Sequence, residues 1–483
     1  MKKMRKIFAL LIAMVMVLGM STSVFAATYD TATVTITGIA DADTVYLYKI
    51  ADAEVGEDNV VKYENVNLFE TSYTIDSLGD ITSDNYTDKS ATGSDAKTAA
   101  DTLAAAAVAT GATAAYTKTG AEAAAGFDVD AGYYVAIVKG TNAEVLYQNM
   151  LINTTPTVND NNSYDPTPAN FAVKKSTVDI TKTAEDIDES QVTTSDGYKK
   201  GDYIPFTITT NIPNYPSNST YATVVIKDTP TGLTIQNSDT YPVVVKVDGT
   251  EVAPGANTYS LDVTDAGMTI TFVKDYVLAN VQKSIVVTYT AQLTAPVVKD
   301  GSAENKATLT YNPNPYDETT NEIDPVVHFD TYGFVFEKTD ENNEPLENAV
   351  FALYDEAGTN PITDENGDEL TFTTKTENNK TYVYFSGLAA GTYTVKETAA
   401  PAGFVTVADF KVTVNSEVAT EDNPATADVT EENYLVIEEA VVNESGVELP
   451  STGGIGTTLF YIIGAVLVIG SGVVLVTHRR MNA

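Results

Sequence analysis

Short runs in which apolar and polar residues alternate recur along most of the chain. Examples are ATVTITGI (32–39), TVYLYKI (44–50), GYYVAIV (132–138), SIVVTYTAQL (284–293) and YGFVFEK (332–338). Successive side chains of a strand point to opposite faces, so this alternation is typical of strands with one buried face. Gly, Pro, Asn and Asp separate the runs, as turns between the strands of β-sandwiches require. The pattern predicts an all-β protein.

One segment departs from this pattern. Residues 94–109, SDAKTAADTLAAAAVA, are rich in alanine, the residue that most favours helices. They predict a short helical insert near the N-terminal end of the fold. The alternative is an alanine-rich loop.

Two segments rich in Pro and Asn divide the chain. They are NTTPTVNDNNSYDPTPAN (153–170) and YNPNPYDETTNEIDP (311–325), and both have the composition of linkers. We therefore predict three tandem immunoglobulin-like β-sandwich domains over residues 27–171, 172–330 and 331–446.

The N-terminus has the pattern of a secretory signal peptide. Four basic residues within the first six precede an apolar stretch, and small residues follow at a cleavage position. We expect a signal peptide over residues 1–26, cut between Ala26 and Ala27. A retained signal anchor is the alternative.

The C-terminus has the pattern of a membrane span. Residues 455–477 carry no charge and are long enough to cross a bilayer as a transmembrane helix in the precursor. A basic tail, residues 478–483, follows. Basic residues mark the cytoplasmic side of a span, so the chain that precedes the span lies outside the cell. The alternative is a buried core helix.

Composition excludes several function classes. The formal net charge is −38, which gives no basic surface for nucleic acid. The chain has no cysteine, so an exported protein must be stabilised without disulfides. Its two histidines, His328 and His478, leave little basis for histidine catalysis. We expect no metal site, no cofactor and no enzymatic turnover on another molecule.

Some polar residues fall on strand faces that should be buried. In the middle domain the alternation aligns Lys182, Asp228 and Asn305 with apolar neighbours. In the third domain it aligns Lys338, Glu397 and Asn443 in the same way.

A buried lysine, carboxyl and asparagine can react with one another. Desolvation lowers the pKa of the lysine and raises that of the carboxyl. A neutral amine is a nucleophile that can attack an asparagine carboxamide, releasing ammonia and leaving an intramolecular isopeptide bond. Buried ion pairs, or lysine stems that reach the surface, are the alternative and are favoured by periodicity alone.

The third domain contains the segments YGFVFEKTDENNEPLENAVFALYD, GLAAGTYTVKETAAPAGF and VVNESGVELPSTGG. With these segments it resembles the collagen-adhesin B-type repeat of Gram-positive surface proteins. This resemblance implies that Lys338 joins Asn443 with the help of Glu397. The middle domain resembles the family's other isopeptide sandwich through DITKTAED, VIKDTPTGL and ENKATLTYNPNP. That likeness implies the same roles for Lys182, Asn305 and Asp228.

Residues 447–454, directly before the expected span, contain LPSTG, formed by Leu449, Pro450, Ser451, Thr452 and Gly453. This motif resembles the LPxTG sorting signal, and the chain as a whole resembles the major shaft subunit of a sortase-assembled pilus. The resemblance implies that a sortase cysteine attacks the Thr452 carbonyl and releases Gly453 with the membrane span.

A shaft subunit also needs a lysine that receives the threonine of the next subunit. The family's pilin motif lies between the first two domains, where this chain reads NFAVKKSTVDITK and lacks the usual Tyr-Pro. Lys174 and Lys175 are both candidates, with a slight preference for Lys174. Solvated linker lysines are the alternative.

The first domain matches the family least. Aligning Gly132 with Gly391 places Val138 where the third domain has its glutamate, and Lys49 has no evident partner set. We expect no isopeptide bond in this domain.

The resemblance implies a structural subunit of a covalent homopolymer on the cell surface, anchored to the peptidoglycan of the cell wall. Its implied partners are a class C-type pilus sortase, the housekeeping sortase, identical subunits, ancillary pilins and a host surface ligand. The alternative is a monomeric LPxTG-anchored adhesin or an ancillary pilin that binds a host ligand.

Overall fold

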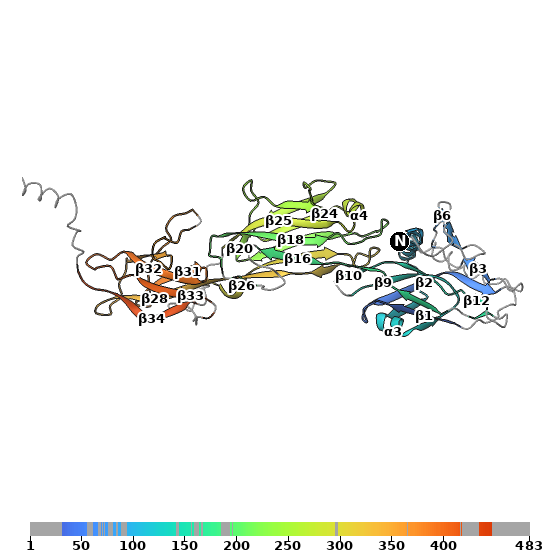
Figure 1. Ribbon diagram of the computed structural model, residues 1–483, viewed down its shortest axis with the longest axis horizontal. Coiled ribbons are helices and arrows are strands. Elements are labelled where there is room, and N and C mark those ends of the chain that lie inside the picture. The colour runs from blue at the N-terminus through green and yellow to red at the C-terminus, as the bar shows by residue number, and fades with distance from the viewer. Residues whose placement is uncertain are drawn as a thin grey trace, which may run out of the picture.

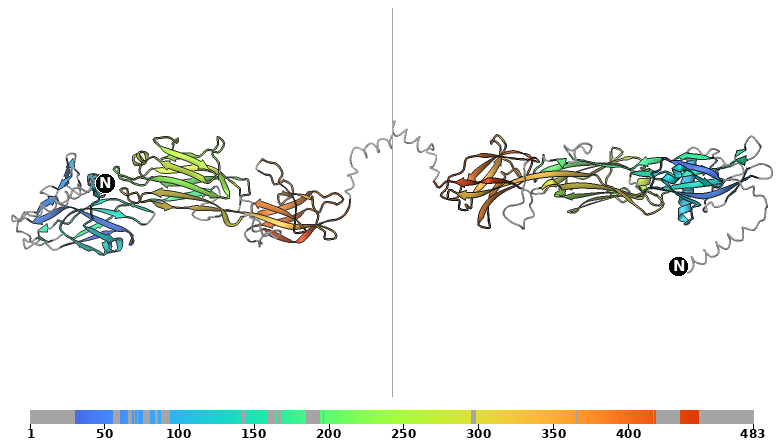
Figure 2. Two further views of the ribbon diagram at one scale, coloured as in Figure 1. Left: turned by 180° about the vertical axis from the view of Figure 1, so that it is seen from behind. Right: turned by 90° about the horizontal axis from the view of Figure 1, so that it is seen from below.

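The computed structural model is an elongated molecule in which three β-rich bodies follow one another in a row (Figure 1). The views from behind and from below show the same row, with no body folded back on another (Figure 2). The structure describes residues 31–446, apart from 56–60, 66–68, 70, 72, 76–80, 84–85, 88–93, 142–143, 156, 159–163, 166–167, 185–193, 196, 295–297, 365, 416 and 418–433.

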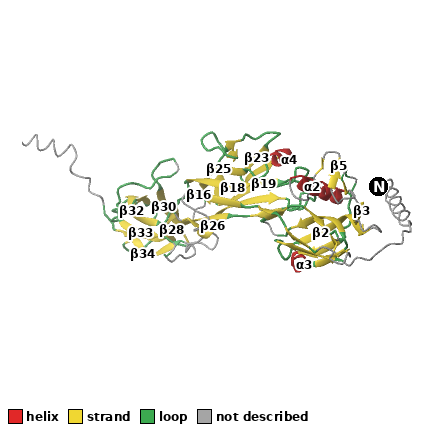
Figure 3. Cartoon of the chain, turned by 45° about the vertical axis from the view of Figure 1, so that its right-hand side comes forward, coloured by secondary structure: helices red, strands yellow, loops and turns green. Residues whose placement is uncertain are grey.

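The first body is a sheet with both faces covered. Strand β9 pairs with β2 and β11, and nearly all of its residues are buried. Tyr134, Ala136 and Val138 point into one apolar cluster, whereas Tyr133 and Val135 point into another that contains α2. The helix therefore covers the second face of the sheet (Figure 3).

Helix α2 spans Ser94–Ala109, the range predicted from the alanine-rich run. The other elements of this body and of the connection that follows are β1 (Ala32–Thr37), β2 (Thr44–Val55), β3 (Val61–Asn65), β4 (Thr74–Ile75), β5 (Ile81–Ser83), β6 (Tyr86–Thr87), β7 (Tyr116–Thr119), α3 (Gly120–Ala125), β8 (Phe127–Val129), β9 (Gly132–Lys139), β10 (Val145–Tyr147), β11 (Met150–Asn153), β12 (Thr157–Val158), β13 (Tyr164–Asp165), β14 (Ala169–Ala172) and β15 (Lys175–Thr177).

The middle body is a sandwich of two sheets. One sheet has the order β16-β18-β25-β21-β22, and the other contains β23-β24-β19-β26. Alternate residues of these strands form one apolar core between the sheets. The elements are β16 (Ile180–Ala184), β17 (Thr194–Ser195), β18 (Tyr203–Asn211), β19 (Val224–Thr231), β20 (Leu233–Ile235), β21 (Val244–Val247), β22 (Thr250–Glu251), β23 (Tyr259–Thr264), β24 (Gly267–Phe272), α4 (Lys274–Ala279), β25 (Ser284–Leu293), β26 (Val298–Tyr311) and β27 (Asn321–Ile323).

The third body is a smaller β-fold around an aromatic core. Phe334, Phe336, Phe351 and Phe385 are all buried in it and contact one another. Its strands are β28 (Val326–Asp340), β29 (Val350–Tyr354), β30 (Thr371–Glu377), β31 (Lys380–Leu388), β32 (Gly391–Ala399), β33 (Phe410–Val414) and β34 (Leu435–Asn443).

Strand β28 runs without a break from the middle body into the third. Its first half pairs with β26, where Phe329 lies opposite Ala303, and its second half pairs with β31, where Phe334 lies opposite Phe385. The domain boundary expected at residue 330 therefore falls inside one continuous strand. The backbone N–H of Lys200 also donates to the carbonyl of Gly387 across this junction, at 2.7 Å.

The prediction that residues 311–325 form a linker is wrong. Asn312, Asn314 and Tyr316 are buried, and the Tyr316 ring packs in the apolar cluster that contains α2. The Tyr316 hydroxyl donates to the carbonyl of Asp101 at 3.1 Å and accepts from Asn149 Nδ2 at 3.0 Å. Tyr316, together with Asp317, which pairs with Lys139, therefore attaches this segment to the first body.

The prediction that residues 153–170 form a linker is also wrong. The described part of this segment includes β12, β13 and the start of β14, which pairs in parallel with β1. Ala169 belongs to the core of the first body. The described part of this segment therefore belongs to the first body and is not a spacer between domains.

No helix within the described ranges is long and apolar enough to cross a membrane. The expected signal peptide (1–26) and its cleavage site at Ala26 and Ala27 lie outside the described residues. So do the sorting signal (Leu449 to Gly453) and the expected span (455–477).

Candidate crosslinking sites

Three strands of the middle body bring Lys182, Asp228 and Asn305 together. Lys182 extends from β16 in one sheet, and Asp228 and Asn305 extend from β19 and β26 in the facing sheet. All three residues are fully buried, so the prediction that they face the core is confirmed.

A tyrosine completes this middle site. Lys182 Nζ contacts Asp228 Oδ2 and donates to the hydroxyl of Tyr289 at 2.7 Å. That hydroxyl donates to Asp228 Oδ2 at 2.7 Å and accepts from Asn305 Nδ2 at 3.0 Å. The hydroxyl of Tyr289 therefore contacts all three of the side chains predicted from the sequence.

Burial favours the neutral form of the Lys182 amine. Desolvation lowers the pKa of Lys182 to about 8, against the opposing effect of the Asp228 carboxylate, which raises it. The aromatic rings of Phe206 and Tyr289 lie 5.2 and 5.4 Å from the amine. Near neutral pH, a lysine in this environment has a far larger neutral fraction than an exposed one.

The third body contains a second set of a lysine, a carboxyl residue and an asparagine. Lys338 extends from β28, Glu397 from β32 and Asn443 from β34, and the whole-residue exposures are 0%, 7% and 1%. Their predicted inward orientation is likewise confirmed. β28 and β34 are parallel neighbours, and Lys338 pairs with Val441, two residues before Asn443.

The carboxylate of this third-body site contacts the asparagine directly. Asn443 Nδ2 donates to both oxygens of Glu397, at 2.9 and 3.0 Å. Lys338 Nζ donates to the carbonyl of Val441 at 2.9 Å. Desolvation lowers the pKa of Lys338 to about 8, while Glu397 raises it to a smaller extent. The third-body site thus holds a nucleophilic amine, a carboxyl and a carboxamide in one buried space.

Both sites leave polar atoms without a hydrogen bond. Asp228 Oδ1 and the carboxamide oxygens of Asn305 and Asn443 are buried, and they have no partner among the described residues. Such atoms are rare in folded proteins because each loses its hydration on burial. A proton on a carboxyl would supply a donor in this space, and a hydrogen bond to a carboxamide oxygen polarises its carbon.

The first body contains no comparable set in its described part. Lys49 contacts Asp52 and lies 3.9 Å from Asp130, with 18% of its side chain exposed. Val138 is buried in the apolar core. These contacts are those of an ordinary ion pair.

The two candidate linking lysines differ in their contacts. Both are exposed in the connection between the first and middle bodies. Lys175 begins β15, pairs with Tyr147, and donates from its amine to the carbonyl of Gly38 at 3.0 Å. Lys174 lies between β14 and β15, where its carbonyl accepts from the N–H of Gln148 at 2.8 Å.

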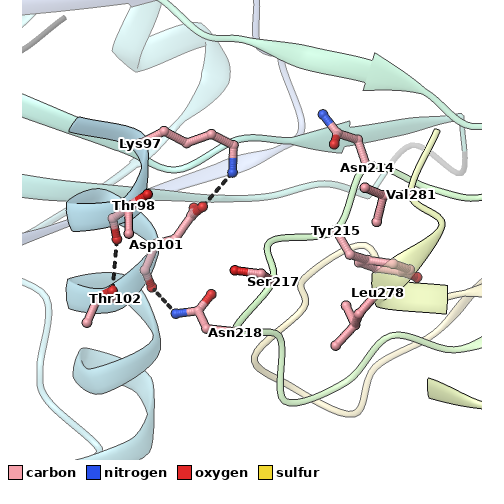
Figure 4. Close-up of a pocket in the computed structure, with 10 residues that line it drawn as sticks. All are labelled: Lys97, Thr98, Asp101, Thr102, Asn214, Tyr215, Ser217, Asn218, Leu278 and Val281. Atoms are coloured by element: carbon pink, nitrogen blue, oxygen red, sulfur yellow. Dashed lines mark hydrogen bonds and ion pairs between the residues drawn. The ribbon is translucent and has the colours of Figure 1, made fainter. Parts of the chain in front are cut away.

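A pocket of about 260 Å³ lies between α2 and the loops of the middle body (Figure 4). Its polar groups are mostly engaged with one another: Lys97 pairs with Asp101, and Asn218 Nδ2 donates to the Asp101 carbonyl at 2.9 Å. No cluster of side chains suited to a metal ion occurs in the described part of the chain.

The sequence reasoning missed Tyr289, although a signal for it was present. The alternation in SIVVTYTAQL places Tyr289 on the same face as Ile285, Val287 and Ala291, and every one of these residues is buried. A buried tyrosine hydroxyl needs a hydrogen-bond partner, so an inward tyrosine opposite a lysine and an aspartate was a candidate member of the site.

Family comparisons agree with the architecture of the C-terminal part. Residues 333–433 match the SpaA family, described as a prealbumin-like fold domain. Residues 442–482 match the Gram-positive LPXTG cell wall anchor motif. The chain is therefore a cell-wall-anchored surface protein with at least one prealbumin-like domain. A search of curated protein sequences returned no match.

Solved structures with the same fold include Gram-positive major pilins. The T6 backbone pilin of Streptococcus pyogenes serotype M6 has a TM-score of 0.62 at 18% identity, over 88% of this chain and all of that one. The major pilins SpaD and SpaA of Corynebacterium diphtheriae have TM-scores of 0.52 and 0.50 at 14% and 16% identity. They cover 88% and 86% of this chain, and 99% and 100% of their own. The chain has the mostly β, multi-domain fold of Gram-positive major pilins.

Proposed function

We propose that the chain is the structural shaft subunit of a covalently polymerised pilus on a Gram-positive cell wall. The observation that carries this proposal is the pair of buried lysines, each placed with a carboxyl and an asparagine, in a chain with the pilin fold and an LPXTG anchor motif. Its domains are residues 27–171, 172–330 and 331–446, and the last boundary lies within the continuous strand β28. In the precursor, residues 455–477 form the membrane helix.

Each buried set forms an isopeptide bond. The lysine amine attacks the carboxamide carbon of asparagine, a new N–C bond forms, the C–NH2 bond breaks, and ammonia leaves. Lys182 joins Asn305 with Asp228 as the acid–base group, and Lys338 joins Asn443 with Glu397 in that role. The contact of Asn443 Nδ2 with Glu397 supports this assignment, because the leaving nitrogen must receive a proton.

Crosslinks of this kind suit a fibre one subunit wide. A noncovalent domain is stable by only about 5–15 kcal/mol, so it opens under sustained tension. A covalent bond between strands far apart in the sequence keeps the intervening chain out of the path of tension. It also restricts the unfolded ensemble as a disulfide would, without an oxidising compartment, in a chain that has no cysteine.

Subunits are joined through Lys174. A class C-type pilus sortase forms a thioester with the Thr452 carbonyl and releases Gly453 with the membrane segment. The amine of Lys174 in the next subunit then displaces the sortase cysteine to form an amide. The amine of Lys175 is held by Gly38, whereas the structure gives the Lys174 amine no hydrogen bond to a described residue. The housekeeping sortase attaches the finished polymer to peptidoglycan, and ancillary pilins complete it.

Immunoblots of cell-wall extracts test this function. The parent chain should give a ladder of high-mass bands, and Lys174→Ala should collapse the ladder to a single band. Lys175→Ala is the matched control and should keep the ladder. A single band from the parent chain would support a monomeric wall-anchored adhesin that binds a host surface ligand. Collapse by Lys175→Ala alone would move the linking role to Lys175.

A further inference from the structure

In the middle site, the hydroxyl of Tyr289 lies between the carboxyl and the leaving nitrogen. It contacts Asp228 Oδ2 at 2.7 Å and Asn305 Nδ2 at 3.0 Å, and it also accepts from Lys182 Nζ. A hydroxyl has one donor and two acceptor sites, and these three contacts use all of them.

The third-body site does not need such a bridge. There Glu397, with one more methylene group than an aspartate, places both of its carboxylate oxygens within 3.0 Å of Asn443 Nδ2. In the middle site, Asp228 Oδ2 contacts Lys182 and Tyr289, and the hydrogen bond from Asn305 Nδ2 goes to Tyr289. The shorter carboxylate is therefore connected to the leaving nitrogen through the hydroxyl.

We propose that Tyr289 is a catalytic residue of the middle-body crosslink and relays a proton from Asp228 to the leaving nitrogen of Asn305. This inference rests on the proposed crosslinking function and adds a fourth residue to it. Tyr289 acts only in the middle domain, which makes the two crosslinking reactions of this chain chemically different.

Every proton that moves in the relay is given and accepted by a named group. Lys182 first gives a proton to Asp228, and the neutral amine attacks the carboxamide carbon of Asn305. In the tetrahedral intermediate Nδ2 has a free lone pair, and the Tyr289 hydroxyl turns from Asp228 to donate to it while the protonated Asp228 donates to the Tyr289 oxygen. Asp228 then gives its proton to the Tyr289 oxygen as the hydroxyl proton passes to Nδ2. Ammonia leaves as the C–N bond breaks, and the proton remaining on the new amide nitrogen returns to Asp228. Tyr289 ends with the same hydroxyl it began with, and no other reactant is needed.

The surroundings of Tyr289 suit a relay. The ring stacks on Phe206 with centroids 5.3 Å apart and an interplanar angle of 12°, which fixes the direction of the hydroxyl. Burial, and to a smaller extent the neighbouring Asp228, hold the pKa of Tyr289 well above its usual value. The hydroxyl therefore keeps its proton at neutral pH, as a group that passes a proton on must do.

Timed mass spectrometry during cell-free synthesis of residues 27–446 tests the relay. Each crosslink lowers the mass by about 17 Da, the mass of one ammonia. Tyr289→Phe keeps the ring and removes the hydroxyl, and it should slow the middle crosslink at least about tenfold. The crosslink between Lys338 and Asn443 should form at the parental rate in the same molecules and serves as the internal control.

Phe206→Leu separates the chemistry of the hydroxyl from the packing of the ring. This variant removes the stacking partner and keeps the hydroxyl, so the middle crosslink should still form faster than in Tyr289→Phe. The relay is refuted if Tyr289→Phe loses both ammonias at the parental rate, or if Phe206→Leu slows the reaction as much as Tyr289→Phe does. A parent chain that loses no ammonia would instead refute the proposed crosslinks themselves.

Discussion

Lys338 and Asn443 lie on the same face of the neighbouring parallel strands β28 and β34, although 104 residues separate them along the chain. Lys338 pairs with Val441, so the asparagine is only two residues further along the adjacent strand. A bond between these side chains would join the first strand of the third body to its last. Tension that enters at the C-terminus would then pass directly into β28, which continues into the middle body.

Removing the third-body carboxyl should remove one crosslink. The unsubstituted chain, residues 27–446, should lose two ammonias, about 34 Da in total, whereas Glu397→Ala should lose one, about 17 Da. Asp228→Ala should also lose only one, because each carboxyl serves its own domain. The intact mass of purified residues 27–446 measures the number of ammonias lost. Glu439→Ala, an exposed position on β34, is the control and should retain both losses. Loss of both ammonias in Glu397→Ala would refute the acid–base role of Glu397.

The Lys338 crosslink should contribute several kcal/mol to stability. By analogy with a disulfide that closes a loop of about 100 residues, Lys338→Met should lower the free energy of unfolding by roughly 4 kcal/mol. Methionine fills a similar volume, so little of this loss would come from a cavity. Thermal and denaturant unfolding measure the effect. Lys380→Met is the control, since this exposed ion pair with Glu337 contributes at most about 1 kcal/mol. Equal effects of the two substitutions would contradict the crosslink.

Crosslink formation should slow in alkaline solution. The reaction needs one proton shared between the amine and the carboxyl, because a neutral amine attacks while a protonated carboxyl supplies the leaving group. The lowered pKa values of Lys182 and Lys338, about 8 in each, mark the pH above which this last proton is lost. The rate of ammonia loss should therefore fall above about pH 8. A rate that keeps rising beyond pH 8 would show that neutral amine alone limits the reaction.

Tyr316 should hold the first body rigidly on the middle body. Tyr316→Ala removes a ring buried among the residues around α2, together with its hydrogen bonds to Asp101 and Asn149. Truncating a buried aromatic side chain costs about 3–5 kcal/mol, so this contact should open.

Spin labels can measure this opening directly, since the chain has no native cysteine. Cysteines introduced at the exposed positions Thr113 and Thr250 would report the distance between the two bodies. The distance distribution should broaden in Tyr316→Ala and stay narrow in Tyr241→Ala, which alters a tyrosine pair on the surface of the middle body. Equally narrow distributions in both would show that the covalent connection alone orients the first body.

The residues of the candidate crosslinking sites could be predicted to face the core because strand alternation is local. Lys182, Asp228 and Asn305 each follow apolar residues at a spacing of two, and this spacing places each of them on the buried face. The third-body residues obey the same rule. Tyr289 was missed because an inward tyrosine looks like any core aromatic residue until its partners are known.

The linker predictions failed for a related reason. Proline and asparagine disfavour regular structure locally, and this property does not reveal whether a segment is exposed. Buried Asn312 accepts from the N–H of Thr223 in the middle body, and buried Tyr316 donates to the carbonyl of Asp101 in α2, so both have partners in distant parts of the chain. The composition of a segment does not reveal which distant residues will contact it.

The sequence by itself determined the β class, the inward orientation of the polar residues, the α2 helix and the C-terminal anchor motif, because each depends on spacing within one short segment. Only the tertiary structure decided that the Tyr289 hydroxyl bridges three side chains, that β28 continues through a domain boundary, and that Tyr316 packs against the first body. These features arise between residues that are distant along the chain, and their positions follow from how the sheets pack and not from any local pattern.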